Sequence, residues 1–349
     1  MSVAATVIQT NGIEKAASEP IAKTGAGASR DSSSGVPHTT YDDVDPATYL
    51  GPHGAERDLV NAQGLRLKTF YWPADQARSV LLFVHGHGAH GLFELLQIEE
   101  LGQPPLYGGW VQKFNEAGIS VVTLDNQGCG RSDGARNLRY FVESFQDYVN
   151  DVLLLRRTLG EVDVPGFRDL PVFLSGISMG GCVALHAALE DQTLFRGLVL
   201  LAPMLSLQRV SRRGLNPYMR PVAALLSRIV PWAAIVATDR NKLNPVLQDQ
   251  WDSDPLVAHI NTRVRNANEY LRCTESIMGR LGEVTLPFIV AHSENDSMCD
   301  PDGSKALYRE ARATDKTIRL VNHMWHVLVK EGGNEILLEE LIAWMQARL

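Results

Sequence analysis

The chain has 349 residues, of which 45% are hydrophobic, so it can bury a substantial core and fits one large domain with an insertion. Its formal net charge of −7 and the absence of a basic cluster argue against nucleic acid as a partner. The four cysteines have neither metal-like spacing nor the density of a disulfide framework, so we expect a reducing compartment and no bound metal.

The first 47 residues are rich in Ser, Ala, Gly and Thr and contain few large apolar side chains. Such a segment cannot bury enough surface to order itself, so we predict a disordered N-terminal tail over residues 1–47. A signal peptide is not expected, because the start lacks a positive stretch followed by an apolar one. A transit peptide is disfavoured, because acidic residues balance the basic ones.

From about residue 50 the chain alternates strand-like and helix-like runs, which is typical of a mostly parallel sheet with helices on both faces. The strand-like runs fall at residues 65–71, 80–84, 119–124, 172–175, 198–202, 287–291 and 317–321. Helices are predicted over residues 110–117, 141–159, 179–189, 303–313 and 334–348. The predicted fold class is therefore α/β.

The most informative motif lies at residues 176–180. Gly176-Ile177-Ser178-Met179-Gly180 follows a strand-like run and opens a helix-like run. A G-x-S-x-G motif between a strand and a helix is the nucleophile elbow of the α/β-hydrolases, in which the serine occupies a strained turn. Gly176 and Gly180 are needed because a β-carbon at either position would clash. We therefore predict an α/β-hydrolase fold with Ser178 as the nucleophile.

The acid of the triad should come between the nucleophile and the base, because this fold orders its triad as serine, acid, histidine. The apolar run 287–291 is typical of a buried parallel strand, and a polar loop follows it. We predict that Asp296 in this loop orients the catalytic histidine and stabilises its charged form. Three other carboxylates compete with it nearby: Glu294, Asp300 and Asp302.

The base should lie in the loop after the last strand-like run, at residues 322–326. Two histidines in this loop compete for the role, His323 and His326. A serine hydroxyl is a weak nucleophile, so the base must come within hydrogen-bond reach of Ser178.

The oxyanion hole needs two backbone N–H donors. One should be the amide of Met179, directly after the nucleophile. The other should come from the loop after the strand-like run 80–84, where the sequence reads His85-Gly86-His87-Gly88-Ala89-His90. We predict the N–H of His87 as this second donor.

About eighty residues separate the strand-like runs on either side of residues 205–283, too many for a simple connection. We predict a helical cap over the active site at 205–283, inserted between the core segments 48–204 and 284–349. Within the cap, residues 217–237 are strongly apolar but are interrupted by arginines and prolines, which argues against a membrane span. This segment either touches a membrane surface and guides an acyl chain inward or packs on the core.

Several motifs occur in one order over most of the chain, at residues 84–86, 124–134, 172–181, 200–204, 239–242, 253–256, 295–300 and 325–328. Together they resemble the monoacylglycerol lipase and lysophospholipase branch of the α/β-hydrolases. The resemblance favours His326 as the base, because Trp325-His326-Val327-Leu328 matches the family's pattern. It implies a serine carboxylester hydrolase that releases a fatty acid from a monoacylglycerol-type lipid through an acyl-enzyme, without a cofactor.

The chain departs from this family at the positions that bind the head group. The resemblance implies that monoacylglycerol lipases hold glycerol with a Glu and an Arg after the H-G loop and with a His after the catalytic one. Here the matching positions are Ala89, Phe93 and Val329. The ester-cleaving chemistry is untouched by these changes, whereas the substrate could instead be a lysophospholipid or a small ester.

Two other classes of function fit the sequence less well. The spacing His85-x-His87-x-x-His90 resembles the H-x-H-x-D-H zinc site of metallo-β-lactamase-like hydrolases, but Ala89 replaces the usual Asp and the serine motifs would have no role. A non-catalytic lipid- or hormone-binding relative is disfavoured, because such proteins typically lose a triad residue and this chain keeps all three.

For location, the sequence predicts a cytoplasmic protein, with membrane association through the cap as an option. The last three residues, Ala347-Arg348-Leu349, are similar to the S-K-L peroxisomal signal. The alternative, which we favour, is that they end an amphipathic helix. The oligomeric state stays open.

Overall fold

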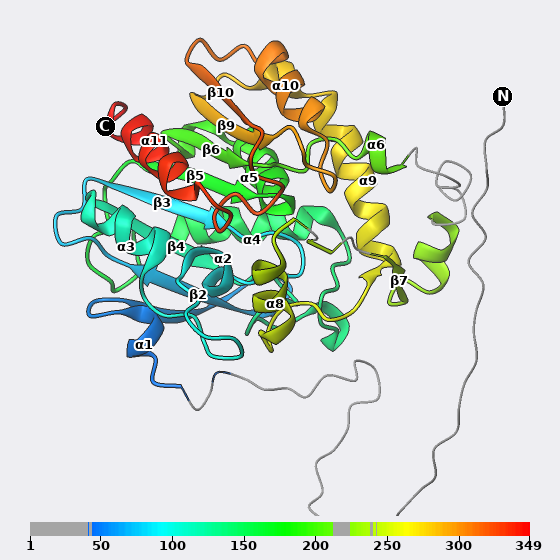
Figure 1. Ribbon diagram of the computed structural model, residues 1–349, viewed down its shortest axis with the longest axis horizontal. Coiled ribbons are helices and arrows are strands. Elements are labelled where there is room, and N and C mark those ends of the chain that lie inside the picture. Colours follow the sequence, from blue (N-terminus) through cyan, green and yellow to red (C-terminus); the bar gives the residue numbers. More distant parts are fainter. Residues whose placement is uncertain (1–40, 42–43, 212–223, 238–239, 242) are drawn as a thin grey trace, which may run out of the picture. The chain divides into compact units, whose positions relative to one another are not determined.

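The computed structural model describes residues 41, 44–211, 224–237, 240–241 and 243–349, which belong to one compact unit. Its centre is an eight-stranded sheet (Figure 1). The strands lie in the order β1 (Ala55–Val60), β2 (Arg66–Trp72), β4 (Ile119–Leu124), β3 (Ser79–Val84), β5 (Val172–Ile177), β6 (Gly197–Leu201), β9 (Phe288–Ser293) and β10 (Lys316–Val321). The pairs β1–β2 and β2–β4 are antiparallel and all the others in this sheet are parallel.

Helices pack on both faces of the sheet, because successive side chains of a strand point to opposite faces. In β3, for example, Val80 and Leu82 belong to one core cluster, whereas Leu81 and Phe83 belong to the other. The first cluster includes side chains of α4 (Phe145–Thr158), α5 (Met179–Glu190) and α10 (Pro301–Glu310), and the second those of α1 (Ala47–Leu50), α2 (Gly91–Leu95), α3 (Gly109–Glu116) and α11 (Asn334–Gln346). The sheet is therefore buried between two layers.

The predicted cap lies between β6 and β9. Its described elements include α6 (Gln208–Ser211), β7 (Ala234–Val236), α8 (Pro245–Ser253), β8 (Thr262–Arg263) and α9 (Val264–Met278). β7 and β8 form a small antiparallel pair, so the cap is not purely helical. Tyr270, Cys273 and Ile277 of α9 join the first core cluster, and α9 contacts both α4 and α5. The cap thus rests directly on the helix that follows the predicted nucleophile.

The predicted strands and helices of the core occur within a few residues of their expected positions. β1 was not predicted, because its sequence Ala-Glu-Arg-Asp-Leu-Val carries three charges. Such a sequence is tolerated here because β1 is an edge strand that pairs with β2 alone. The short helix α2 was also missed, since five residues give no periodicity to detect.

The ends of the described chain bear on two of the predictions. Tyr41 lies inside the predicted tail 1–47, yet it is buried and its hydroxyl donates to Asp254 Oδ2 over 2.6 Å. The folded part therefore includes a residue before the predicted boundary, whereas residues 1–40 and 42–43 lie outside the described residues. At the other end, Arg348 pairs with Asp315 over 2.8 Å and lies 3.9 Å above the ring of Trp344. These contacts agree with the interpretation of a helix end.

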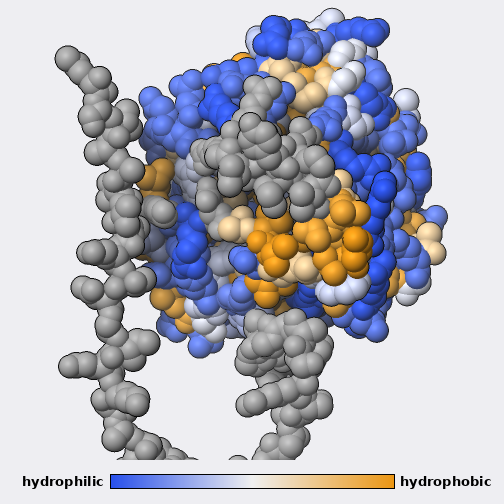
Figure 2. Space-filling view, turned by 90° about the vertical axis from the view of Figure 1, so that its right-hand side faces the viewer, coloured by the Kyte–Doolittle hydropathy of each residue, from blue (hydrophilic) through white to orange (hydrophobic). Residues whose placement is uncertain are grey.

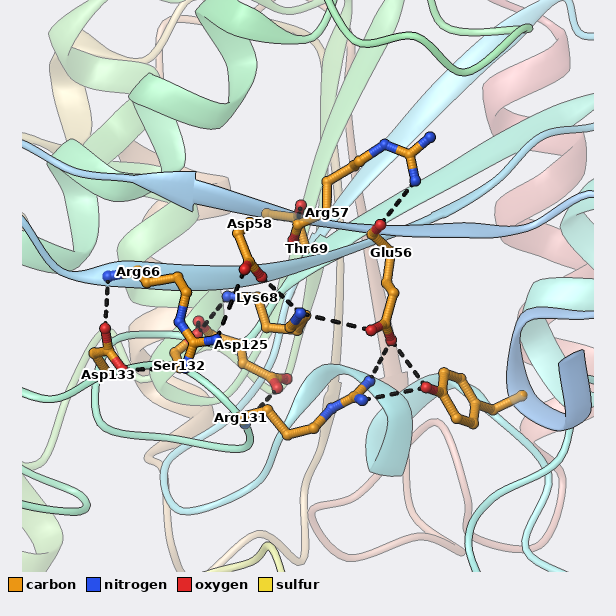
Figure 3. Close-up of polar contacts among 11 residues, drawn as sticks. Glu56, Arg57, Asp58, Arg66, Lys68, Thr69, Asp125, Arg131, Ser132 and Asp133 are labelled. Carbon is orange, nitrogen blue, oxygen red and sulfur yellow. Dashed lines mark hydrogen bonds and ion pairs between the residues drawn. The ribbon is translucent and has the colours of Figure 1, made fainter. Parts of the chain in front are cut away.

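A polar network joins the sheet edge to the loop after β4 (Figure 3). Arg131 of this loop pairs with Glu56 of β1 over 2.7 Å. Asp125 accepts the N–H of Arg131 over 2.8 Å and the N–H of Gly91, at the start of α2, over 2.9 Å. Ser132 donates to the carbonyl of Asp125 over 2.6 Å. The segment 124–134 thereby fixes where α2 begins, and with it the end of the H-G loop.

Candidate active site

The strand–turn–helix around Ser178 has the geometry expected of a nucleophile elbow. β5 ends at Ile177, Ser178 adopts φ 54° and ψ −121°, and α5 begins at Met179. A β-carbon on Gly176 would lie 2.3 Å from the carbonyl oxygen of Gly180, and one on Gly180 would lie 2.1 Å from that of Val84. Both positions therefore exclude any side chain, and the strained backbone at Ser178 is held between them.

The two predicted oxyanion donors flank Ser178. Met179 N–H is the first amide of α5, where the helix dipole favours negative charge. His87 follows Gly86, whose position lies so close to the elbow that an added β-carbon would be 3.5 Å from Ser178 Cβ. Ser178 and His87 line the same cavity. This juxtaposition brings the H-G loop to the nucleophile from a segment about ninety residues earlier.

Asp296 and His326 form a buried pair. His326 Nδ1 lies 2.7 Å from Asp296 Oδ2, and both residues are about 95% buried. Asp296 Oδ1 accepts the N–H groups of Met298 and Cys299 over 2.8 and 2.9 Å. His292, which the sequence did not single out, lies 3.2 Å from Asp296 Oδ2 through its Nε2. The carboxylate is therefore fixed in one orientation.

The charges of this pair shift both pKa values. Burial alone would raise the pKa of Asp296, but the charge of His326 and the hydrogen bonds of His292 and His326 outweigh it and hold the pKa well below its usual range. Burial likewise disfavours the charged form of His326, yet the charge and hydrogen bond of Asp296 raise its pKa above the usual value. His326 is thus a stronger base than an isolated histidine.

The side chains that compete with Asp296 and His326 for the roles of acid and base either pair with other residues or are exposed to solvent. Asp300 is buried but accepts the Ser206 hydroxyl over 3.0 Å. Glu294 and Asp302 are exposed and pair with a lysine and an arginine of the surface. His323 is exposed. None of these four rivals takes part in the Asp296–His326 contact.

Ser178 Oγ makes a loose contact in this conformation. It lies 3.8 Å from Cys299 Sγ, and among the described contacts no hydrogen bond joins it to His326. Ser178 and His326 nevertheless line one cavity. Hydrogen bonds between a nucleophile and its base are often long before a substrate binds, so this separation leaves their proposed partnership intact.

Glu331 holds the loop that carries His326. Its Oε1 accepts the N–H groups of His326 and Val327 over 3.1 and 2.9 Å, and its Oε2 accepts the N–H of Trp325. Three consecutive amides are therefore fixed by one buried carboxylate. Sequence reasoning missed this residue, because only the folded loop brings its side chain back over those amides.

The cavity beside Ser178 has a volume of about 340 Å³. Core and cap residues both line it, including Phe93, Leu247, Trp251 and Val327, together with the polar side chain of Glu94. Glu94 is 6% exposed, its Oε1 accepts the N–H of Gly86 over 3.3 Å, and its Oε2 has no hydrogen-bond partner among the described residues. Burial raises the pKa of Glu94. An acceptor is thus left open at the wall of a cavity that polar and apolar side chains line together.

The three positions at which the sequence predicts a loss of the family's head-group contacts, Ala89, Phe93 and Val329, are all buried. Ala89 and Phe93 pack in a small apolar cluster with the cap residues Leu247 and Val257. Phe93 reaches the cavity, whereas Val329 belongs to the core on one face of the sheet. At Ala89 and Phe93, apolar packing between core and cap therefore takes the place of the polar contacts that the resemblance implies.

The histidines of the H-G loop do not converge on a common point. His85 Nδ1 lies 2.8 Å from the carbonyl of Gly86, and its Nε2 accepts the N–H of Asn126. The His87 ring lies between Thr262 and Tyr270, and His90 pairs with Asp254 of the cap over 3.2 Å. Within the described part of the chain, these rings do not form a group of potential metal ligands. The arrangement disfavours the zinc-hydrolase alternative.

The order of the three candidate residues along the chain is a serine after β5, an acid after β9 and a histidine after β10. This order is the one that defines serine hydrolases of the α/β-hydrolase class. The family model Hydrolase_4, described as serine aminopeptidase S33, matches residues 75–333. The chain belongs to this family. The predicted α/β-hydrolase fold is thereby confirmed.

Individual relatives agree with the family. The monoglyceride lipase of Rattus norvegicus is 30% identical over 297 residues, which cover 83% of this chain and 90% of that protein. The caffeoylshikimate esterase of Arabidopsis thaliana is 28% identical over 246 residues, covering 68% and 71%. The predicted resemblance to monoacylglycerol lipases is confirmed by these matches.

A solved structure supports the fold independently. A soluble variant of the monoglyceride lipase from Saccharomyces cerevisiae, in complex with a substrate analog, superposes with a TM-score of 0.71 at 18% identity, covering 87% of this chain and 98% of that chain. At this identity the likeness concerns the fold alone. Among the described residues, no helix has both the length and the apolar character needed to cross a membrane.

Proposed function

We propose that this protein is a serine carboxylester hydrolase that releases a fatty acid from a monoacylglycerol-type lipid. The observation that carries the proposal is the buried 2.7 Å contact of Asp296 with His326, beside a cavity that Ser178 also lines. Relatives named monoglyceride lipase, which match over most of the chain, support a lipid ester as the substrate.

In the proposed mechanism, His326 Nε2 takes the proton of Ser178 Oγ as this oxygen attacks the ester carbonyl carbon. Asp296 holds Nδ1–H and stabilises the imidazolium that forms. The N–H groups of Met179 and His87 donate to the developing oxyanion, and losing one such donor typically costs about a hundred- to a thousandfold in turnover. His326 then protonates the leaving alcohol, and water hydrolyses the acyl-enzyme.

The alcohol portion of a monoacylglycerol carries hydroxyl groups that need hydrogen-bond partners in the site. Because Ala89, Phe93 and Val329 cannot supply the family's polar contacts, another group must hold a glycerol. We propose that the unpartnered oxygen of Glu94 accepts a hydroxyl of the alcohol portion. A lysophospholipase or a small-ester esterase is the alternative, and the likeness to a caffeoylshikimate esterase supports the esterase.

The apolar part of the cap favours contact with a membrane surface over simple packing on the core. Of the segment 217–237, residues 224–237 are described. Five of its large apolar side chains are exposed: Leu225, Ile229, Trp232, Ile235 and Val236. Figure 2 shows a hydrophobic patch on the face of the molecule turned toward the viewer. We propose a peripheral, reversible membrane contact through this segment, in a cytoplasmic protein.

The test is acyl release by wild type and by Ser178→Ala from monoacylglycerol, lysophosphatidylcholine and a short-chain aryl ester. We expect Ser178→Ala to lose several orders of magnitude in turnover with the fold intact. Ser276→Ala, which changes an exposed serine of α9, is the matched control and should keep full activity. Activity of Ser178→Ala close to wild type would contradict the mechanism.

The same three substrates test the head-group assignment through Glu94→Gln and Glu94→Leu. If Glu94 holds a hydroxyl of the alcohol portion, Glu94→Leu raises KM for monoacylglycerol about tenfold and leaves the aryl ester little changed, whereas Glu94→Gln keeps an acceptor and loses less. Equal effects on all three substrates would remove Glu94 from head-group recognition. A wild-type preference for lysophosphatidylcholine or the aryl ester would assign the alternative substrate class.

A further inference from the structure

Three potential metal ligands meet behind the nucleophile elbow, at the contact of α5 with the cap helix α9. Cys182 and His186 lie one turn apart on α5, and Cys273 comes from α9. One ligand atom of each lies within 4.8 Å of the other two, and all three residues are buried. Ninety-one positions separate the two cysteines in sequence, so no short motif reveals the cluster.

The separations fit a single bound ion. Cys182 Sγ and Cys273 Sγ lie 3.8 Å apart. Two thiolates that bind one tetrahedral ion at about 2.3 Å lie about 3.8 Å apart, so the sulfurs already have the required spacing. A disulfide needs about 2.05 Å between its sulfurs, and the helices or side chains would have to move to form it.

The hydrogen bonding of His186 matches that of a metal-binding histidine. His186 Nε2 lies 3.2 Å from the carbonyl oxygen of Cys273. Since a carbonyl can only accept, Nε2 carries the hydrogen and Nδ1 carries the lone pair. Histidines that bind metals commonly donate their other ring N–H to a backbone carbonyl in this way, which fixes the tautomer and the ring orientation. Here the carbonyl belongs to a second candidate ligand.

We propose that Cys182, His186 and Cys273 form a structural site for a thiophilic cation with a filled d shell, Zn²⁺ or Cu⁺. Two sulfurs and one imidazole are the donors that these ions select over carboxylate-preferring ions such as Mg²⁺ and Ca²⁺. The site is distinct from the cavity beside Ser178, since none of its three residues lines that cavity.

An ion at this site would join the cap to the nucleophile helix. The N–H of Cys182 donates to the carbonyl of Ser178 over 3.2 Å, so one ligand is tied directly to the elbow residue. Cys273 lies on the cap helix that packs against α5. Occupancy should therefore stabilise the folded state and hold α9 of the cap against α5.

The experiment starts from full-length wild type, purified under reducing conditions and stripped of metal. It is titrated separately with Zn²⁺, with Cu⁺ kept reduced, and with Mg²⁺, and bound metal is measured by mass spectrometry together with Tm. We expect about one equivalent of Zn²⁺ or Cu⁺ and a rise in Tm, with no Mg²⁺ bound. Comparison of the Zn²⁺ and Cu⁺ titrations identifies the ion. Binding of neither thiophilic ion to wild type overturns the proposal, whatever the variants do.

Variants then locate the ion. Cys182→Ala and Cys273→Ala should each reduce the bound metal at least tenfold, whereas Cys129→Ala, which removes a buried thiol elsewhere, should keep it. If a cysteine variant does not fold, His186→Gln replaces it. Co²⁺ loading supplies a further readout, because thiolate coordination gives an intense charge-transfer band in wild type and Cys129→Ala. Undiminished binding in both α5 and α9 variants, or isolation of Cys182 and Cys273 as a disulfide, also overturns the proposal.

Discussion

The hydrogen bonds of Asp296 hold its carboxylate in an orientation that positions the ring of His326. Its Oδ1 accepts two backbone N–H groups, and its Oδ2 faces His326 and His292. Both oxygens are thus occupied, and the carboxylate cannot turn without leaving buried donors unpaired. At the scale of the residue, the geometry favours an acid that aligns a ring and stabilises its positive charge.

Asp296→Asn removes the negative charge of Asp296 and keeps the shape of its side chain, so it tests whether this charge orients His326. We expect Asp296→Asn to lower kcat/KM for the aryl ester about ten-thousandfold, because the amide favours the wrong tautomer of His326. Asp296 raises the pKa of His326, so its loss should move the acidic limb of the residual pH profile to lower pH, where the neutral base now persists. The pH dependence of kcat/KM measures both effects.

Asp302→Asn is the control for that change, since Asp302 is an exposed carboxylate of α10 that also competed for the role. Its activity and pH profile should match the wild type. A large loss in Asp302→Asn, or an unshifted acidic limb in Asp296→Asn, would contradict the assignment.

At the scale of the elements, the elbow depends on how closely α5 approaches β3. The carbonyl oxygens of Val84 and His85 lie within 2.5 Å of where a β-carbon on Gly180 would be. Both are backbone atoms of the central sheet and its following loop, so they cannot move aside as a flexible side chain would. The glycine therefore sets the distance between helix and sheet.

Gly180→Ala should destabilise the fold by about 3 kcal/mol or more, because α5 must shift away from β3 to admit the methyl group. Equilibrium unfolding in urea gives the change in midpoint. Gly160→Ala is the matched control, since no atom lies within 4 Å of the added carbon, and it should unfold close to wild type. Equal stability of the two variants would show that the elbow tolerates a side chain.

Sequence patterns revealed the elements whose burial is visible in their own residues, without knowledge of distant partners. β3, β5 and β9 are buried along their whole length, so they appear as continuous apolar runs bounded by polar loops. β1 escaped notice because its charges are satisfied by β2 and by Arg131, from a distant loop. Glu94, His292 and Glu331 were missed for the same reason, since their roles come from contacts between segments that only folding brings together.

At the scale of the whole molecule, the cap has two contrasting parts. α9 is buried against α4 and α5, whereas residues 225–236 present large apolar side chains to solvent. An exposed apolar segment on the cap of a lipid-ester hydrolase is suited to contact a membrane from which substrate is taken. In that case α9, packed on α4 and α5, would hold residues 225–236 in a constant position relative to Ser178.

Removing apolar surface from this segment should weaken membrane binding without affecting the chemistry. We expect Ile229→Ser combined with Trp232→Ser to reduce binding to phosphatidylcholine vesicles about thirtyfold, since each side chain contributes on the order of 1 kcal/mol when partly inserted. Turnover of the soluble aryl ester should stay unchanged. Co-sedimentation with vesicles measures the binding.

Ile336→Ser provides the comparison, because Ile336 of α11 is equally exposed, at 63% against 60% for Ile229, but lies outside the cap. Vesicle binding of this variant should equal that of wild type. A similar loss in both variants would mean that the membrane contact is not specific to residues 225–236.

The hydroxyl of Tyr41 has a practical consequence for anyone who shortens the protein. Asp254 of the cap accepts that hydroxyl, and it also pairs with His90, which caps α2 at the end of the H-G loop. Trimming the chain at residue 47, where composition alone would place the cut, deletes one of the partners of a buried carboxylate. The unpaired carboxylate oxygen would lie beside His90, in the same loop as His87. A shortened protein for crystallisation should therefore begin before Tyr41, so that this hydrogen bond is kept.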